Sequence, residues 1–265
     1  MQIFDYLCVL NLLFSRLAEW FNLLISWWWG ESLFGDSSRL LDIWPSYSKS
    51  PILTHFGWSP LITAALAANA RIIHPSLSSL TPSSFSPYSN PTPHSGLLAL
   101  HVRRGDYVDH CRSLASWSSH FMGFNEFPGL PDRFSPLLAA NEARPAPTPE
   151  EEEEEREALY RAHCFPNTEQ IVSRVREVRR SLLSTTRLTR VYVLTNGRSE
   201  WLQELKDALQ EDAVRERMDP WEHIATSRDL RLTREQQRVG QAIDMAVAQR
   251  AEVFLGTGVR FFFTG

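Results

Sequence analysis

The second half of the chain carries apolar residues at the three- and four-residue spacing of amphipathic helices. Two such faces are Ile171, Val175, Val178 and Leu182, and then Val239, Ala242, Ile243, Ala246 and Val247. Between them, Ser199–Leu209 is predicted as a helix with Ser199 as its cap. Thr233-Arg234-Glu235-Gln236 has the spacing of a capping box, which predicts the start of the last helix. Alanine and leucine spacing predicts an earlier helix over Pro60–His74.

Short apolar runs separate these helices and predict buried strands. They cover Leu97–Val102, Val191–Leu194 and Glu252–Leu255. From residue 96 onward, the order is strand, long insertion, helix, strand, helix, helix, strand. This alternation is typical of βαβ units, so we expect an α/β domain with a Rossmann-like parallel sheet and flanking helices.

Composition indicates how the chain is divided. Residues 75–95 are rich in serine and proline, with almost no charge, and are predicted to be a linker. Residues 1–74 then form a helical N-terminal part, and residues 96–265 form the Rossmann-like domain. Within that domain, residues 145–156 combine prolines with consecutive glutamates from Glu150 to Glu155. Because these glutamates repel one another, we expect Pro145–Glu155 to be disordered and dispensable.

Residues 1–29 are rich in leucine, phenylalanine and tryptophan, but charges at Asp5, Arg16 and Glu19 interrupt them. A membrane-spanning helix needs roughly 18 apolar residues, and no uncharged stretch here reaches that length. No basic segment precedes the apolar one, so no signal peptide is predicted. We expect a helix that is buried or covered by a partner, with a helix in the membrane interface as the alternative.

Composition and motifs exclude several classes of function. The 265 residues carry a net charge of −4, so no basic field is present to bind nucleic acid. The sequence has no Asp-x-Asp, no G-x-S-x-G, and no His or Cys pair at zinc-ligand spacing. We therefore predict no metal, no cofactor and no serine hydrolase site.

The loop His101–Asp106 follows the first predicted strand, and ligands of open parallel sheets bind beyond the carboxyl ends of strands. Arg103 and Arg104 suit a phosphate, because a guanidinium group presents two parallel donors. His101 is in place for a ribose or base, and Asp106 for orienting an arginine. On spacing alone, the alternatives are arginines that pair with surface carboxylates and an Arg-Gly-Asp adhesion motif.

The sequence L-A-L-H-V-R-R-G-D at 98–106, followed by Tyr107 and Cys111, resembles the His-x-Arg loop of GDP-fucose protein O-fucosyltransferases. The resemblance continues through C-F-P at 164–166, V-Y-V-L-T-N-G at 191–197, T-S-R-D-L at 226–230 and Q-A-I-D-M-A-V-A-Q-R-A-E-V-F-L-G at 241–256. It covers roughly residues 97–256, and more weakly 55–74, and is closest to the divergent fungal branch of the family.

This resemblance implies a GT-B-type, inverting, metal-independent glycosyltransferase that moves fucose from GDP-fucose to a Ser or Thr hydroxyl of a protein. Arg103 falls on the arginine that grips the diphosphate and stabilises its developing charge. His101 falls on the histidine beside the nucleoside, and Asp244 on the aspartate that reads guanine. The other substrate-binding positions implied are Arg104, Asp106, Gly256 and Arg260.

The resemblance also implies a disulfide bond between Cys111 and Cys164, with Cys8 left as a thiol. It implies the secretory pathway, in the endoplasmic reticulum or Golgi lumen, where such a bond persists.

Two departures from the family pattern predict little or no fucose transfer. The sequence has no counterpart of the family's Gly/Asn-rich loop near the N-terminus, and Arg260 stands where a small hydroxyl residue is expected. Residues 1–74 are also short for the first domain of such an enzyme, so we expect an incomplete N-terminal part. The alternatives are a non-catalytic GDP-binding protein of the same fold and an interaction protein that uses its acidic and Ser/Pro-rich segments.

Overall fold

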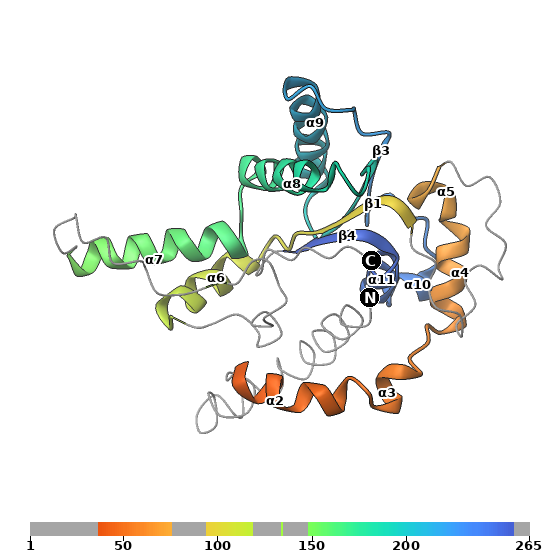
Figure 1. The fold of residues 1–265 in the computed structure, drawn as a ribbon, viewed down its shortest axis with the longest axis horizontal. Helices are drawn as coiled ribbons and strands as arrows, with labels where there is room; N and C mark the ends of the chain where they lie inside the picture. Colours follow the sequence, from red (N-terminus) through yellow and green to blue (C-terminus); the bar gives the residue numbers. More distant parts are fainter. Residues whose placement is uncertain (1–36, 76–93, 119–133, 135–147, 257–265) are drawn as a thin grey trace. The chain divides into compact units, whose positions relative to one another are not determined.

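The computed structural model describes residues 37–75, 94–118, 134 and 148–256 (Figure 1). The chain forms two compact units, and each is described here by itself. One unit contains residues 1–56 and 109–161, and the other contains residues 57–108 and 162–265. The second unit holds the sheet, together with residues 57–75 from the N-terminal part of the chain.

The sheet has four parallel strands in the order β3-β2-β1-β4. Their bounds are β1 His94–His101, β2 Arg190–Leu194, β3 His223–Thr226 and β4 Ala251–Gly256. His101 at the end of β1 pairs with Leu194 on one side and Gly256 on the other. The carboxyl ends of these strands therefore meet at one edge of the sheet. This arrangement confirms the predicted α/β, Rossmann-like parallel sheet.

Three of the strands coincide with predicted apolar runs, whereas β3 was missed. Its sequence, HIAT, is only four residues long, and its first two residues are partly exposed. A segment this short and half-exposed shows no continuous apolar run, so the pattern does not predict it.

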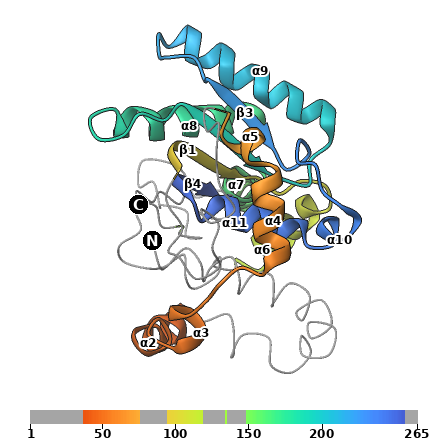
Figure 2. The same cartoon turned by 90° about the vertical axis from the view of Figure 1, so that its right-hand side faces the viewer.

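One face of the sheet is covered by α8 Thr168–Leu182 and α9 Ser199–Arg215 (Figure 2). The buried contact joins alternate strand residues, among them Leu98, Leu100, Val191 and Val193, to the predicted apolar face of α8 and to Leu202, Leu205 and Leu209 of α9. A capping box between Asn167 and Gln170 starts α8. The prediction of Ser199 as a cap is wrong, because Arg198 holds the N-cap position without a side-chain hydrogen bond.

The opposite face carries α4 Pro60–Ala68, α10 Arg234–Gln237 and α11 Gly240–Ala248 (Figure 2). The helix predicted over Pro60–His74 is interrupted at Asn69, and α5 Ala70–Ile73 follows. The buried side chain of Asn69 accepts from Arg231 N at 2.7 Å and donates to Arg231 O at 3.0 Å. The predicted capping box at Thr233 is confirmed, but it begins the short α10 rather than α11.

The prediction of a disordered acidic segment is wrong for residues 149–155, which begin the helix α7 Pro149–Cys164. Thr148 Oγ1 accepts from Glu151 N, and Glu151 Oε2 accepts from Thr148 N, which is a capping box. Glutamate is a good helix former, and negative charge in the first turn complements the positive end of the helix dipole. These terms exceed the repulsion between the carboxylates. Residues 145–147 lie outside the described part of the chain.

Three further helices are α2 Ser37–Tyr47, α3 Pro51–Thr54 and α6 Tyr107–Ser116. In the described segments, no helix has both the length and the apolar character that crossing a membrane requires. Residues 1–29, for which a buried or interfacial helix is predicted, lie outside those segments.

Candidate functional site

The loops that follow β1 and β2 interlock at the carboxyl edge of the sheet. Thr195 Oγ1 donates to Val102 O. Asn196 Oδ1 accepts from Arg104 N at 2.7 Å, and Asn196 Nδ2 donates to Arg104 O at 3.1 Å. Gly105 has a φ of +71°, a left-handed conformation that favours glycine. The β1 loop is thus held by side chains of the β2 loop on both sides of Arg103.

Arg103 presents its guanidinium group toward solvent, with 42% of its side chain exposed. Its Nη2 lies 3.9 Å from Asp106 Oδ2, and its Cζ lies 4.9 Å from the centre of the Tyr107 ring. Asp106 is 80% exposed, so this ion pair is weak and compatible with ligand binding by Arg103. Asp106 therefore lies close enough to Arg103 for the predicted role of orienting an arginine.

Arg104 has a different environment from Arg103. Its guanidinium Cζ lies 4.6 Å from the Phe165 ring centre and 4.2 Å from that of Trp201, and the residue is only 9% exposed. Its Nε and Nη2 have no hydrogen-bond partner among the described residues. Burial lowers the pKa of Arg104 to about 10, a shift that the charge of Glu204 opposes.

The two predicted phosphate ligands therefore differ in their surroundings, and phosphate binding by Arg104 stays a prediction. The side chain of Arg104 is buried against Phe165 and Trp201, whereas 42% of the Arg103 side chain is exposed. Arg103 remains the stronger candidate for a phosphate ligand, and the buried side chain of Arg104 packs the loop against Phe165 and Trp201.

His101 is the last residue of β1 and is partly buried. Alternation along the strand places it on the opposite face from Leu98 and Leu100, which is the face that α11 covers. Burial, and then the charge of Arg103, lower the pKa of His101 to about 4. The imidazole is consequently neutral near pH 7 and suits hydrogen bonding to an uncharged group.

Asp244 lies in the middle of α11 and accepts two hydrogen bonds. Tyr192 Oη donates to its Oδ1 at 2.6 Å, and Ser227 Oγ donates to its Oδ2 at 2.8 Å. Ser227 Oγ in turn accepts from Thr195 N at 3.1 Å. A chain of contacts thus connects Asp244 to the loop that holds Arg103. Burial raises the pKa of Asp244 to about 6, although both hydrogen bonds act to lower it.

Thr195 and Asn196 belong to a loop that the sequence places at the end of a predicted strand, but no role was predicted for them, and Tyr192 and Ser227 were not singled out. All four lie within the runs V-Y-V-L-T-N-G and T-S-R-D-L, so the signal was present. Gly256 is the last residue of β4 and pairs with His101 of β1, and its role in substrate binding stays a prediction. Arg260 lies outside the described residues.

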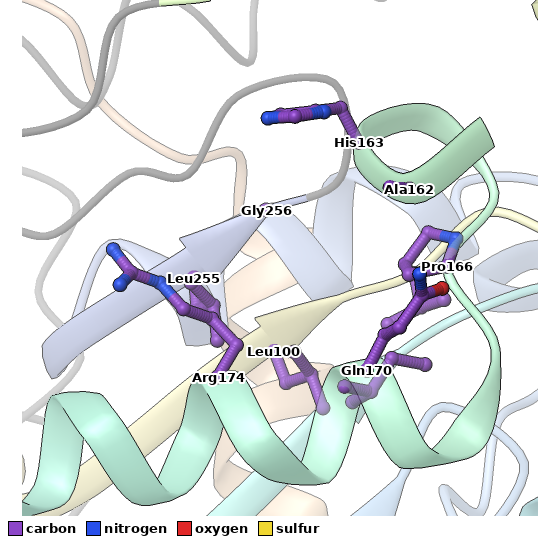
Figure 3. A pocket seen from close by; sticks show the side chains of 10 residues that line it. Leu100, Ala162, His163, Pro166, Gln170, Arg174, Leu255 and Gly256 are labelled. Atoms are coloured by element: carbon purple, nitrogen blue, oxygen red, sulfur yellow. The ribbon is translucent and has the colours of Figure 1, made fainter. Parts of the chain in front are cut away.

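A small pocket of about 70 Å³ lies on the α8 side of the same edge (Figure 3). Its walls include Leu100, Leu255, Gln170 and Arg174, and Gly256 is the one predicted site residue among its lining. Ligand clefts usually measure roughly 300–1,000 Å³, so this pocket is too small for a sugar nucleotide. Across the described segments, no three His, Cys, Asp or Glu side chains are placed to share a metal ion.

Cys111 of α6 and Cys164 at the end of α7 are both fully buried. Each is disulfide-bonded. Their pairing with one another remains the prediction made from the resemblance, and Cys8 lies outside the described residues.

The parallel sheet with helices on both faces is the α/β, Rossmann-like architecture of a GT-B-type glycosyltransferase domain. The family model for GDP-fucose protein O-fucosyltransferase matches residues 54–259, which include all four strands. The chain therefore belongs to the GDP-fucose protein O-fucosyltransferase family. A comparison with curated proteins gives no match.

Proposed function

We propose that this protein binds GDP-fucose at the carboxyl edge of its sheet and that its reaction is fucose transfer to a Ser or Thr hydroxyl of a protein. Family membership supports the class of reaction. The observation that carries the proposal is the outward guanidinium of Arg103, which extends from a loop held on both sides.

Arg103 acts on the diphosphate. A guanidinium group binds phosphate oxygens through paired donors and keeps its charge at neutral pH. During transfer, the acceptor hydroxyl oxygen forms a bond to fucose C1 while the bond from C1 to the diphosphate oxygen breaks, and the hydroxyl proton is released to solvent. The leaving diphosphate takes the bonding electrons, and Arg103 stabilises this charge as it develops.

Asp244 and His101 act on the nucleoside. A carboxylate has about four lone-pair positions, and Asp244 uses two of them for Tyr192 and Ser227. The remaining positions suit the N1–H and N2–H₂ donors of guanine. The neutral imidazole of His101 suits a ribose hydroxyl or the base edge. By analogy with the family, we place the reaction in the secretory pathway.

Calorimetric titration with GDP, GDP-fucose and ADP tests the binding site. We expect GDP to bind more tightly than ADP. Arg103→Ala should weaken GDP binding by roughly 30- to 150-fold, the equivalent of about 2–3 kcal/mol. Arg187→Ala is the matched control, because Arg187 is 70% exposed and pairs with Asp219 instead. Equal GDP affinity in wild type and Arg103→Ala would refute the site.

Transfer is measured separately with labelled GDP-fucose and a folded acceptor domain. Transfer that Arg103→Ala abolishes supports the full proposal. GDP binding without transfer supports the alternative of a non-catalytic GDP-binding protein, to which the two departures in the sequence point.

A further inference from the structure

We propose that Asn196 and Thr195 are positioning residues for Arg103: they fix the backbone on either side of it, so that its guanidinium is already aimed at the diphosphate before the ligand arrives. This inference rests on the proposed function, because it takes Arg103 to be the diphosphate ligand.

The backbone contacts enclose Arg103. On its N-terminal side, Thr195 Oγ1 donates to Val102 O, and Val102 N donates to Leu194 O at 3.0 Å. On its C-terminal side, Asn196 binds both the N–H and the C=O of Arg104. One side chain thus satisfies both backbone groups of Arg104, as a neighbouring strand would. Arg103 lies between two fixed peptide groups, and its own side chain extends outward.

The side chain of Arg104 adds a second restraint. It lies between the rings of Phe165 and Trp201, and Trp201 Nε1 donates to Thr168 Oγ1 at 3.3 Å. The ring of Trp201 also packs on Gly197, where a Cβ atom would come within 2.6 Å of its Cε3. The backbone at Arg104 is thus held both by Asn196 and by the burial of its own side chain, next to the more exposed Arg103.

Binding costs less conformational entropy when the side chain that contacts the ligand extends from backbone that is already ordered. We call the hydrogen bonds of Thr195 and Asn196 to residues 102 and 104 the clamp. In this proposal Asn196 acts on GDP binding through Arg103 alone, so loss of the clamp should weaken GDP binding. A purely structural asparagine would change stability without this selective effect on binding.

The chain offers a matched control for this distinction. Asn69 holds Arg231 in the same way, accepting from its N–H at 2.7 Å and donating to its C=O at 3.0 Å. Asn69→Ala therefore removes an equivalent pair of hydrogen bonds, together with the bond from Asn69 Nδ2 to Ala65 O at 2.9 Å. We expect Asn196→Ala to weaken GDP binding about tenfold and Asn69→Ala to change it less than about twofold.

A double-mutant cycle with Arg103→Ala shows whether Asn196 acts through Arg103. In the Arg103→Ala background, Asn196→Ala should cause no further loss of GDP affinity, because the side chain that it positions is absent. Two losses that add would overturn the proposal, as would unchanged GDP affinity in Asn196→Ala alone.

Thr195 supplies a second pair of variants that preserve shape. Thr195→Val removes the hydroxyl that binds Val102 O, whereas Thr195→Ser retains it. We expect weaker GDP binding in the valine variant and recovery in the serine variant. Equal affinities in these two variants would count against the clamp.

Hydrogen exchange separates this inference from the proposed function. Exchange at residues 103–106 should accelerate in Asn196→Ala and stay unchanged in Asn69→Ala. If wild-type protein does not bind GDP, the proposed function fails, and the exchange rates alone decide whether the clamp exists. Unchanged exchange at residues 103–106 in Asn196→Ala overturns it.

Discussion

The hydroxyl of Tyr192 in β2 donates a 2.6 Å hydrogen bond to Asp244 Oδ1 in α11. This contact joins a central strand to the helix that covers it, and Ser227 Oγ occupies the other carboxylate oxygen. Burial and the neighbouring carboxylate raise the pKa of Tyr192 well above its usual value, so its proton stays in place. Asp244 is the member of this group that changes charge near neutral pH, since its pKa is about 6.

The first prediction follows from that pKa. Guanine donors favour the carboxylate form of Asp244, so GDP affinity should fall as pH decreases from about 7 to about 5. The phosphates of GDP also titrate in this range, and Asp244→Asn corrects for them because its side chain has no charge to lose. Titrations at several pH values should give a steeper dependence for wild type than for Asp244→Asn. Parallel profiles would show that Asp244 does not read the base.

The second prediction concerns acid stability. Burial, followed by the charge of His74, lowers the pKa of His94 to about 4 from an ordinary value near 6.5. Because the pKa of His94 is lower in the folded state than in the unfolded state, protonation of His94 favours unfolding. Its contribution to the free energy of unfolding is therefore complete above about pH 6.5 and is lost as pH falls toward 4. Urea denaturation should show the free energy of unfolding declining across this window, and His94→Gln should reduce the slope.

His101 contributes to the slope in the same direction, whereas Asp244, with its raised pKa, contributes in the opposite direction between about pH 6 and 4. Replacement of the exposed His55 by Gln serves as the control. A slope in His94→Gln identical to that of wild type would contradict the prediction.

The third prediction compares two glycines. A Cβ at Gly197 would lie 2.6 Å and 2.8 Å from Trp201 ring carbons, whereas one at Gly240 would meet nothing within 4 Å in the described part of the chain. Gly197→Ala should therefore lower the free energy of unfolding by about 1–3 kcal/mol. Gly240→Ala, at the first residue of α11, should raise it by up to about 1 kcal/mol. Thermal or urea denaturation checks both values, and equal effects would show that Trp201 moves aside.

The fourth prediction is the pairing of Cys111 with Cys164. Closing a loop of this length should stabilise the fold by on the order of 4 kcal/mol on the chain-entropy description. Non-reducing peptide mapping should recover one cross-linked pair that contains both residues, and a reductant or Cys164→Ser should lower the melting temperature. Cys8→Ser is the control. A cross-link from either cysteine to Cys8 would contradict the pairing.

Local pattern in the sequence was enough to predict the elements that bury a continuous apolar face. The helix α8 and the strands β1, β2 and β4 were found because nearly every inward position is Leu, Ile or Val. The strand β3 lacks that signal. The start of α7 was misjudged because charge repulsion was weighed without the Thr148–Glu151 capping box.

Candidate site residues could be chosen from the sequence where chemistry and strand position coincide, as for His101 and Arg103, whose roles stay predictions. The contacts that hold them were not predictable, because they join distant parts of the chain. Asn196 and Arg104 are 92 residues apart, and Tyr192 and Asp244 are 52 apart. The two adjacent arginines look alike in sequence, and the positions of Phe165 and Trp201 distinguish them only after folding.

Asn196 is followed by glycine, a pair in which the next backbone nitrogen readily attacks the side-chain amide and expels ammonia, and water then opens the cyclic imide to aspartate or isoaspartate. In the folded chain that nitrogen, Gly197 N, donates to Thr195 Oγ1 at 3.0 Å, and the amide is held by Arg104. Neither reacting group can close the five-membered ring while the loop is intact. The rate of deamidation at Asn196 is therefore set by how often the loop opens. Each conversion would remove the donor to Arg104 O and introduce a negative charge into this loop.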